Sequence, residues 1–302
     1  MKTQTKGVWI TLLAAACFGV ASPIAKWVYS FGVSAGTMLV LRFIMATVLI
    51  WGYVLLVRKD LNPRLRKGQV LLLALTGGVM YFVANQGYFN AIEYIPICIQ
   101  IMIFYTYPFI VNVLSIFFFK RKMTLIQVLA LVAAFAGILM TVSMDDMQLN
   151  FIGCALCLMG AFANAGYLMF LEKKAVAEVD SIVIVAYVVT FTCLSFLIWT
   201  AVQGGFTAGF LKIPLPAWGG IFAIAVFTTL LGTIALSVGI KYVGSAKAAI
   251  ISVFEPVEAI LLGVLLFGER LTLRGWIGII LVIGAILLVN LQQAKPEENE
   301  HK

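Results

Sequence analysis

The sequence predicts an all-α membrane protein with ten transmembrane helices arranged as two inverted five-helix repeats. Of the 302 residues, 63% are hydrophobic and 11% are charged, whereas soluble domains carry about 25% charged residues. The apolar residues fall into ten runs of roughly the twenty residues that a helix needs to cross the hydrocarbon core. In addition, segments that lie 148 residues apart resemble each other.

The ten runs follow one another with short polar connections. They cover residues 8–29, 33–57, 69–90, 95–119, 124–143, 149–171, 181–203, 217–240, 246–267 and 272–291. The first run resembles a secretory signal because Lys2 and Lys6 precede it, but it continues to Tyr29, so we expect an uncleaved helix. The predicted domains are therefore an N-terminus (1–7), a first repeat (8–143), a second repeat (149–291) and a polar tail (292–302).

Basic residues gather in the loops after the second, fourth and sixth runs. These are Arg58, Lys59, Arg64, Arg66, Lys67, Lys120, Arg121, Lys122, Lys173 and Lys174. The alternate loops hold Glu93, Asp145, Asp146, Lys212, Glu269, Arg270 and Arg274. The positive-inside rule then places both termini in the cytoplasm. The expected location is the plasma membrane, which in a bacterium is the inner membrane, with the chain crossing it several times. The same loops account for the net charge of +8, so no nucleic-acid partner is expected.

This orientation predicts which loops an impermeant thiol reagent reaches. In a cysteine-free background, a cysteine replacing Asp145 should be labelled from outside intact cells, and one replacing Arg121 should be labelled only after lysis. The reverse pattern would overturn the orientation.

The second half of the chain repeats the first without a gap. Pro108 and Pro256, Thr124 and Thr272, and other matching residues are each 148 residues apart, so YPFIVNVLSIFFFKRKMTL aligns with EPVEAILLGVLLFGERLTL. Because each repeat contains an odd number of spans, the second is expected to be inverted relative to the first. Inverted repeats are typical of transporters that bind substrate near the membrane midplane.

Four segments carry a resemblance to a known family. FGVASPIAK, LRF, AIEYIP and above all FEPVEAILLGVLLFGERLT resemble the EamA type of the drug/metabolite transporter superfamily, over residues 7–142 and 152–290. The resemblance implies a cavity lined by helices one, three, four, six, eight and nine, with helices five and ten at the periphery. It also implies export of amino acids, related metabolites or drugs. The chain departs from the family pattern at Phe18, at Glu258 and at the turn Lys120–Lys122.

The ninth run contains two carboxylates near the depth of the membrane centre. A charged side chain there costs about 2.5–3.5 kcal/mol to insert, so Glu255 and Glu258 need a function or a partner. Pro256 breaks the helix and leaves the Ser252 carbonyl without its usual donor. Pro108 is the corresponding helix break in the equivalent run of the first repeat. We expect Glu255 to be the most sensitive residue of the chain, with Arg42 or Glu258 as its partner.

Two basic residues within the spans have alternative interpretations. Arg42 is a counter-charge for a carboxylate substrate or for Glu255, or a structural ion pair between helices. Lys26, near the end of the first run, contributes to coupling or extends its amine to the interface.

Uncharged polar side chains concentrate on the runs that the repeat argument places at the centre. Each alone would be an interhelical hydrogen bond, but together they predict a cavity, whereas the fifth and tenth runs have almost none. The expected cavity residues are Tyr81, Asn85, Tyr105, Tyr107, Asn164, Thr229 and Glu255.

Other function classes lack the residues they require. The only histidine, His301, lies beyond the last run, so GVSAG at residues 32–36 has no base for a serine hydrolase, and no P-loop occurs. The five cysteines do not suggest a metal site, and no cofactor is expected.

The sequence thus predicts a secondary transporter and not an enzyme. It would export small amphipathic metabolites such as amino acids or drugs by alternating access, with a channel or a receptor or assembly subunit as the alternative. Its expected partners are the small-molecule substrate, the lipid bilayer and protons carried by Glu255 or Glu258, since a membrane carboxylate can bind and release a proton. Exchange or facilitated diffusion is equally compatible with the sequence, and so is a homodimer.

Overall fold

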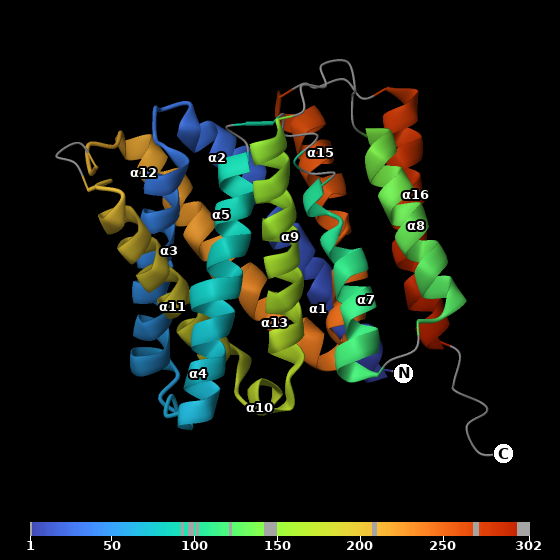
Figure 1. Cartoon of the computed structure of the whole chain (residues 1–302), viewed down its shortest axis with the longest axis horizontal. Coiled ribbons are helices and arrows are strands. Elements are labelled where there is room, and N and C mark those ends of the chain that lie inside the picture. The colour runs from blue at the N-terminus through green and yellow to red at the C-terminus, as the bar shows by residue number, and fades with distance from the viewer. Residues whose placement is uncertain are drawn as a thin grey trace.

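The computed structural model describes residues 2–91, 94–95, 100, 103–120, 123–141, 150–206, 210–267 and 272–294. Within these ranges the regular elements are helices, without strands, and they pack side by side into one bundle (Figure 1).

The helices of the first half follow the predicted apolar runs. They are α1 (Lys2–Gly19), α2 (Ala21–Tyr29), α3 (Ala35–Gly52), the π-helical η1 (Tyr53–Val57), α4 (Lys67–Leu75), the π-helical η2 (Thr76–Tyr81), α5 (Phe82–Ala91), α7 (Tyr107–Phe119) and α8 (Leu125–Thr141).

The second half follows a similar order, although its first helix is unbroken where the first half has α1 and α2, and no π-helical segment follows its second helix. It contains α9 (Phe151–Glu172), the short α10 (Lys174–Ala177), α11 (Ser181–Val202), α12 (Leu215–Ala223), the π-helical η3 (Ile224–Gly232), α13 (Thr233–Val243), α14 (Ser245–Ile251), α15 (Phe254–Phe267) and α16 (Leu273–Ala294).

Several helices begin where a side chain caps the first turn. The Asn150 side-chain oxygen accepts a hydrogen bond from the Ile152 amide (2.9 Å), and Asp180 does the same for Ile182 (2.8 Å). Such residues satisfy backbone donors that have no partner inside the helix. The sequence therefore sets the starts of α9 and α11 locally.

The structure supports membrane crossing for part of the predicted set. Six helical segments of the described residues are long and apolar enough to cross a bilayer: Gln4–Tyr29, Ala35–Val57, Lys67–Ala91, Phe151–Glu172, Ser181–Val202 and Leu215–Val243. The apolar helices Tyr107–Phe119, Leu125–Met140 and Leu273–Leu288 are shorter. Ten crossings, and the side of each terminus, stay predictions.

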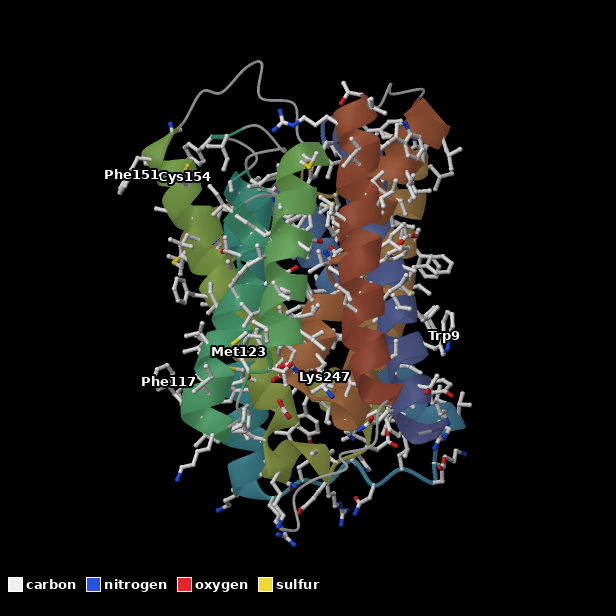
Figure 2. All side chains as sticks on the ribbon, turned by 90° about the vertical axis from the view of Figure 1, so that its right-hand side faces the viewer. Trp9, Phe117, Met123, Phe151, Cys154 and Lys247 are labelled. Atoms are coloured by element: carbon white, nitrogen blue, oxygen red, sulfur yellow. The ribbon has the colours of Figure 1, made fainter. Side chains whose placement is uncertain are left out.

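Large apolar side chains cover the outside of the bundle. Trp9, Phe117 and Phe151 are 68%, 72% and 86% exposed and point away from the bundle (Figure 2). Water would make so extensive an apolar surface unfavourable, whereas lipid accommodates it. The exterior is that of a membrane protein.

The two halves contact each other in a reciprocal pattern. Helix α1 of the first half packs on α13 and α15 of the second, and α9 of the second packs on α5 and α7 of the first. Helices α8 and α16 pack on each other at one edge of the bundle, as the family resemblance implies for helices five and ten (Figure 1).

Glycines allow the closest of these contacts. A Cβ atom at Gly87 of α5 would collide with the backbone of α9 at Leu156 and Gly160. Small residues at such crossings let helix backbones approach and pack by van der Waals contact.

The loop after η1 lies at the same end of the bundle as the start of α1 and the short α10 (Figure 1). There Arg58 and Asp60 form an exposed ion pair with a 2.7 Å separation between Nη2 and Oδ2. The Arg58 guanidinium lowers the pKa of the Asp60 carboxyl group, chiefly by hydrogen bonding.

Candidate functional site

An open cavity lies where the helices of the two halves meet, with about 720 Å³ of empty space when the part open to solvent is included. Its wall combines one guanidinium, one carboxyl group, amides, hydroxyls and many aromatic rings. The lining residues are Phe18, Ala21, Arg42, Tyr81, Ala84, Asn85, Tyr88, Phe89, Phe104, Tyr107, Asn164, Tyr167, Leu168, Thr228, Leu236, Ser252 and Glu255. A concave site of this mixed apolar and polar character is typical of small-molecule binding.

Two helix interruptions bring polar groups to the cavity wall. In the first half the chain turns at Tyr105 and Thr106 before α7, and in the second half it turns at Ser252 and Val253 before α15. Tyr107 and Glu255 therefore lie in the first turns of two helices that begin at the cavity. Irregular backbone at membrane depth is expected only where it borders protein or a cavity.

The prolines lie just inside the new helices. Pro108 is in the first turn of α7, and Pro256 is in the first turn of α15, where a missing amide hydrogen costs little. The Ser252 carbonyl, which loses its usual helical donor at Pro256, accepts a hydrogen bond from the Glu255 amide instead, at 3.1 Å. In this turn the donor is the amide three residues later in the sequence, in place of the usual helical donor four residues later.

The π-helical segments η2 and η3 also border the cavity. They begin at Thr76 and Ile224, which are 148 residues apart, so both repeats deviate from α-helical geometry at equivalent positions. Tyr81 ends η2 and Thr228 lies in η3, and both line the cavity. Single π-helical turns are often found at functional sites.

Glu255 lies among hydroxyl groups. The Tyr105 hydroxyl is within hydrogen-bonding reach of its carboxyl group, and the Tyr107 hydroxyl is an electrostatic neighbour that also lies near the Ser252 side chain. Hydroxyl donors stabilise a carboxylate where water is scarce. Tyr105 itself is 2% exposed and does not line the cavity, so its hydroxyl reaches Glu255 from the protein interior.

Arg42 makes a different contact from the one that the sequence predicted. It is 2% exposed, its Nε donates a 2.6 Å hydrogen bond to Thr229 Oγ1, and its guanidinium lies over the rings of Phe43 and Phe89 at 5.2 and 5.8 Å. The expected ion pair with Glu255 is not formed at 4.0 Å or less between these two described residues. Its orientation is set instead by Thr229 and by the two rings, which attract a cation.

The remaining polar residues divide between the wall and its support. Asn85 and Asn164 line the cavity, and Asn85 Nδ2 donates to the Tyr81 carbonyl at 2.7 Å. Thr229 does not line it but bonds to Arg42, which does. Lys26 is exposed and lies off the cavity wall.

Aromatic rings form most of the remaining wall, and the sequence did not predict those of Tyr88, Phe104 and Tyr167. Tyr81 stacks on Tyr167 with centroids 4.6 Å apart, and Phe104 contacts Tyr88 at 4.6 Å and Tyr107 at 5.6 Å. Tyr88 follows Asn85 by three residues, and Tyr167 follows Asn164 by three. Because residues three apart share a helix face, extending the polar faces by one turn would have found them.

The part of the chain that the structure describes contains no group of three or more histidine, cysteine, aspartate or glutamate side chains suited to a metal ion. The chemistry of the wall is that of reversible binding: a cation, a carboxyl group, hydrogen-bonding groups and rings.

Comparison with known proteins gives consistent matches. The EamA-like transporter family profile matches residues 5–143 and 151–291. The uncharacterized transporter YcbK of Bacillus subtilis (strain 168) is 28% identical over 294 residues, covering 94% of this chain and 90% of that protein. An uncharacterized transporter of Archaeoglobus fulgidus is 25% identical over 221 residues, covering 73% of this chain and 76% of its own.

A solved crystal structure has the same fold. It superposes with a TM-score of 0.81 over 95% of this chain and 99% of its own, at 15% sequence identity.

Proposed function

The chain belongs to the EamA-like transporter family, and from this premise we propose that it is a secondary exporter of small amphipathic metabolites such as amino acids or drugs. The observation that carries this proposal is the cavity whose lining includes both Arg42 and Glu255. It lies at the junction of the two family repeats.

The substrate class follows from the composition of the wall. Arg42 offers a buried cation for a carboxylate or another hydrogen-bond acceptor, and Glu255 accepts an amine or hydroxyl. The rings of Tyr88, Phe104 and Tyr167 offer an apolar surface for the body of the molecule. A small molecule with polar groups and an apolar body would satisfy all of these residues.

Alternating access is the proposed mechanism. The reciprocal contacts of α1 and α9 with the opposite halves, and the equivalent starts of η2 and η3, support two inverted five-helix repeats around a pseudo-two-fold axis. Such repeats allow the two sides of a central site to exchange roles. Proton coupling through Glu255 or Glu258, exchange and facilitated diffusion are all compatible with this arrangement.

Transport by purified protein in liposomes tests the function. A thermal-shift screen against amino acids, nucleosides and cationic drugs should first identify a ligand, because a ligand at about 100 times its Kd stabilises the folded state by about 2.7 kcal/mol. Radiolabelled ligand should then show saturable counterflow. Phe117→Ala, which changes an exposed outer ring, should transport like the unmodified protein.

Flux that does not saturate, or that shows no counterflow, would indicate a channel. A ligand that binds without crossing the membrane would indicate a receptor or assembly subunit.

A further inference from the structure

Glu258 is a second carboxyl group at membrane depth, and it is separate from the cavity. It follows Glu255 by three residues on α15, but it is absent from the cavity wall. Its side chain is half-buried, and its Oε2 atom is fully buried without a hydrogen-bond partner among the described residues. The transport site described above leaves this group unexplained.

The carboxyl group packs against the point where the first predicted span is interrupted. Helix α1 ends at Gly19, the chain turns at Val20, and α2 begins at Ala21. A Cβ atom on Gly19 would lie 2.7 Å from Glu258 Oε2 and 3.0 Å from its Cβ and Cδ, so glycine is what allows this approach.

The same interruption lacks a backbone hydrogen bond. Pro23 has no amide hydrogen, so the Gly19 carbonyl loses its ordinary helical donor four residues later. We call residues Gly19–Pro23 the α1–α2 break. Phe18 and Ala21, at the two sides of Gly19 and Val20, line the substrate cavity. A shift of the break would therefore change the cavity wall.

Among the residues that the structure describes, few ionisable groups lie near Glu258. The helices that pack most extensively on α15 are α1, α2 and α16. Helix α1 brings the Cys17 thiol close to it, Lys26 of α2 and Arg274 of α16 have exposed side chains, and Glu255 is its neighbour on α15.

Burial without a partner restricts the charge of this group. An ionised carboxylate is costly to remove from water unless it is paired and hydrogen-bonded. The packed arrangement of α15 on the α1–α2 break is therefore compatible with the neutral carboxyl group, and ionisation would favour an arrangement in which water reaches Glu258.

We propose that Glu258 is a proton-binding site outside the substrate cavity, and that its protonation controls the packing of α15 on the α1–α2 break. If the proposed transport function holds, this site couples substrate movement to protons, while Glu255 contacts the substrate. The coupling rests on the proposed function, whereas proton binding by Glu258 can be measured without any substrate.

Infrared difference spectroscopy of the purified full chain tests proton binding, with pH change as the only perturbation. Raising the pH from mildly acidic to mildly alkaline should remove a carbonyl band of a protonated carboxyl group. Glu258→Gln should lack this band, whereas Glu255→Gln should retain it. A band that is unchanged in Glu258→Gln, or lost only in Glu255→Gln, would overturn the proposal.

Hydrogen–deuterium exchange of residues 17–24 tests the conformational part. After correction for intrinsic exchange rates, the unmodified protein should exchange about tenfold faster at the alkaline pH than Glu258→Gln, which keeps a neutral group there. Glu258→Leu gives a second neutral side chain and should resemble Glu258→Gln. Glu255→Gln should keep the pH response, and pH-independent exchange in the unmodified protein would overturn the proposal.

These measurements separate failure of this inference from failure of the proposed function. A protein that shows both pH responses but no counterflow of any screened ligand would contradict transport and keep the proton site. A protein with saturable counterflow but no Glu258 band would support transport and contradict the proton site.

Discussion

Replacing Glu255 by glutamine should lower the rate of substrate counterflow at least about tenfold, while protein level and membrane insertion stay unchanged. The reason is that Glu255 is the carboxyl group on the cavity wall, in the first turn of α15. Glutamine keeps the size of the side chain and removes the negative charge that an amine or hydroxyl of the substrate would meet.

Counterflow in liposomes with the ligand found by thermal shift is the measurement. Glu178→Gln, the same exchange at an exposed position after α10, is the matched control and should transport normally. A second control, Tyr107→Phe, removes a neighbouring hydroxyl on the same wall and should reduce the rate less than Glu255→Gln does.

A Glu255→Gln protein that transports at the unmodified rate would contradict this prediction and assign Glu255 to packing. A protein that fails to accumulate would also indicate a structural role. Residual transport in Glu255→Gln should keep its dependence on external pH if Glu258 binds the proton, and should lose it if Glu255 does.

Replacing Arg42 by glutamine is the second change with a large expected effect. A hydrogen bond to a charged group is worth about 1.5–3 kcal/mol, so the Kd for a carboxylate-bearing ligand should rise by about 10- to 100-fold. Arg42→Lys should restore little of the affinity, because an ammonium cannot reproduce the forked guanidinium contact. The corresponding ligand without its carboxylate should bind both variants and the unmodified protein alike.

Two variants distinguish ligand binding by Arg42 from a structural role. Arg58→Gln changes an exposed arginine that pairs with Asp60, and it should leave ligand affinity unchanged. Thr229→Ala removes the hydroxyl that accepts from Arg42 Nε, and it should weaken binding less than Arg42→Gln because the charge remains. Unchanged ligand affinity in Arg42→Gln, together with a lower melting temperature, would contradict the prediction.

The sequence alone determined that this is a helical membrane protein, and it indicated where along the chain the helices lie. Apolar runs of membrane length, interrupted by charged loops, predicted helices, and the described residues form helices within these runs. Most ends lie within a few positions of the expected ones, but α1 begins at Lys2, α7 begins only at Tyr107, and the first and ninth runs are each divided into two helices. Such boundaries depend on local chemistry: Asn150 and Asp180 cap the helices that follow them. Pro108 and Pro256 marked the two interruptions at the cavity for the same reason, because proline lacks an amide hydrogen.

The depth of a residue was also estimated from the sequence. Five of the residues that the sequence predicted to border a cavity line the one described here: Tyr81, Asn85, Tyr107, Asn164 and Glu255. The concentration of polar residues on particular helices was informative because polar groups inside a membrane need partners or water.

Only the tertiary structure decided which groups face each other. Depth alone suggested Glu255 as the partner of Arg42, but the rotation of α3 against η3 brings Arg42 to Thr229. The packing of the other helices likewise places Tyr105 and Thr229 outside the cavity lining and Glu258 against Gly19.

The physical reason lies in the range of the interactions. Helix periodicity, caps and prolines act over a few residues and can be read along the chain. The rotation of one helix against another depends on side chains far apart in sequence, such as Arg42 and Thr229, which are 187 residues apart, and on glycines such as Gly87, which let two backbones meet.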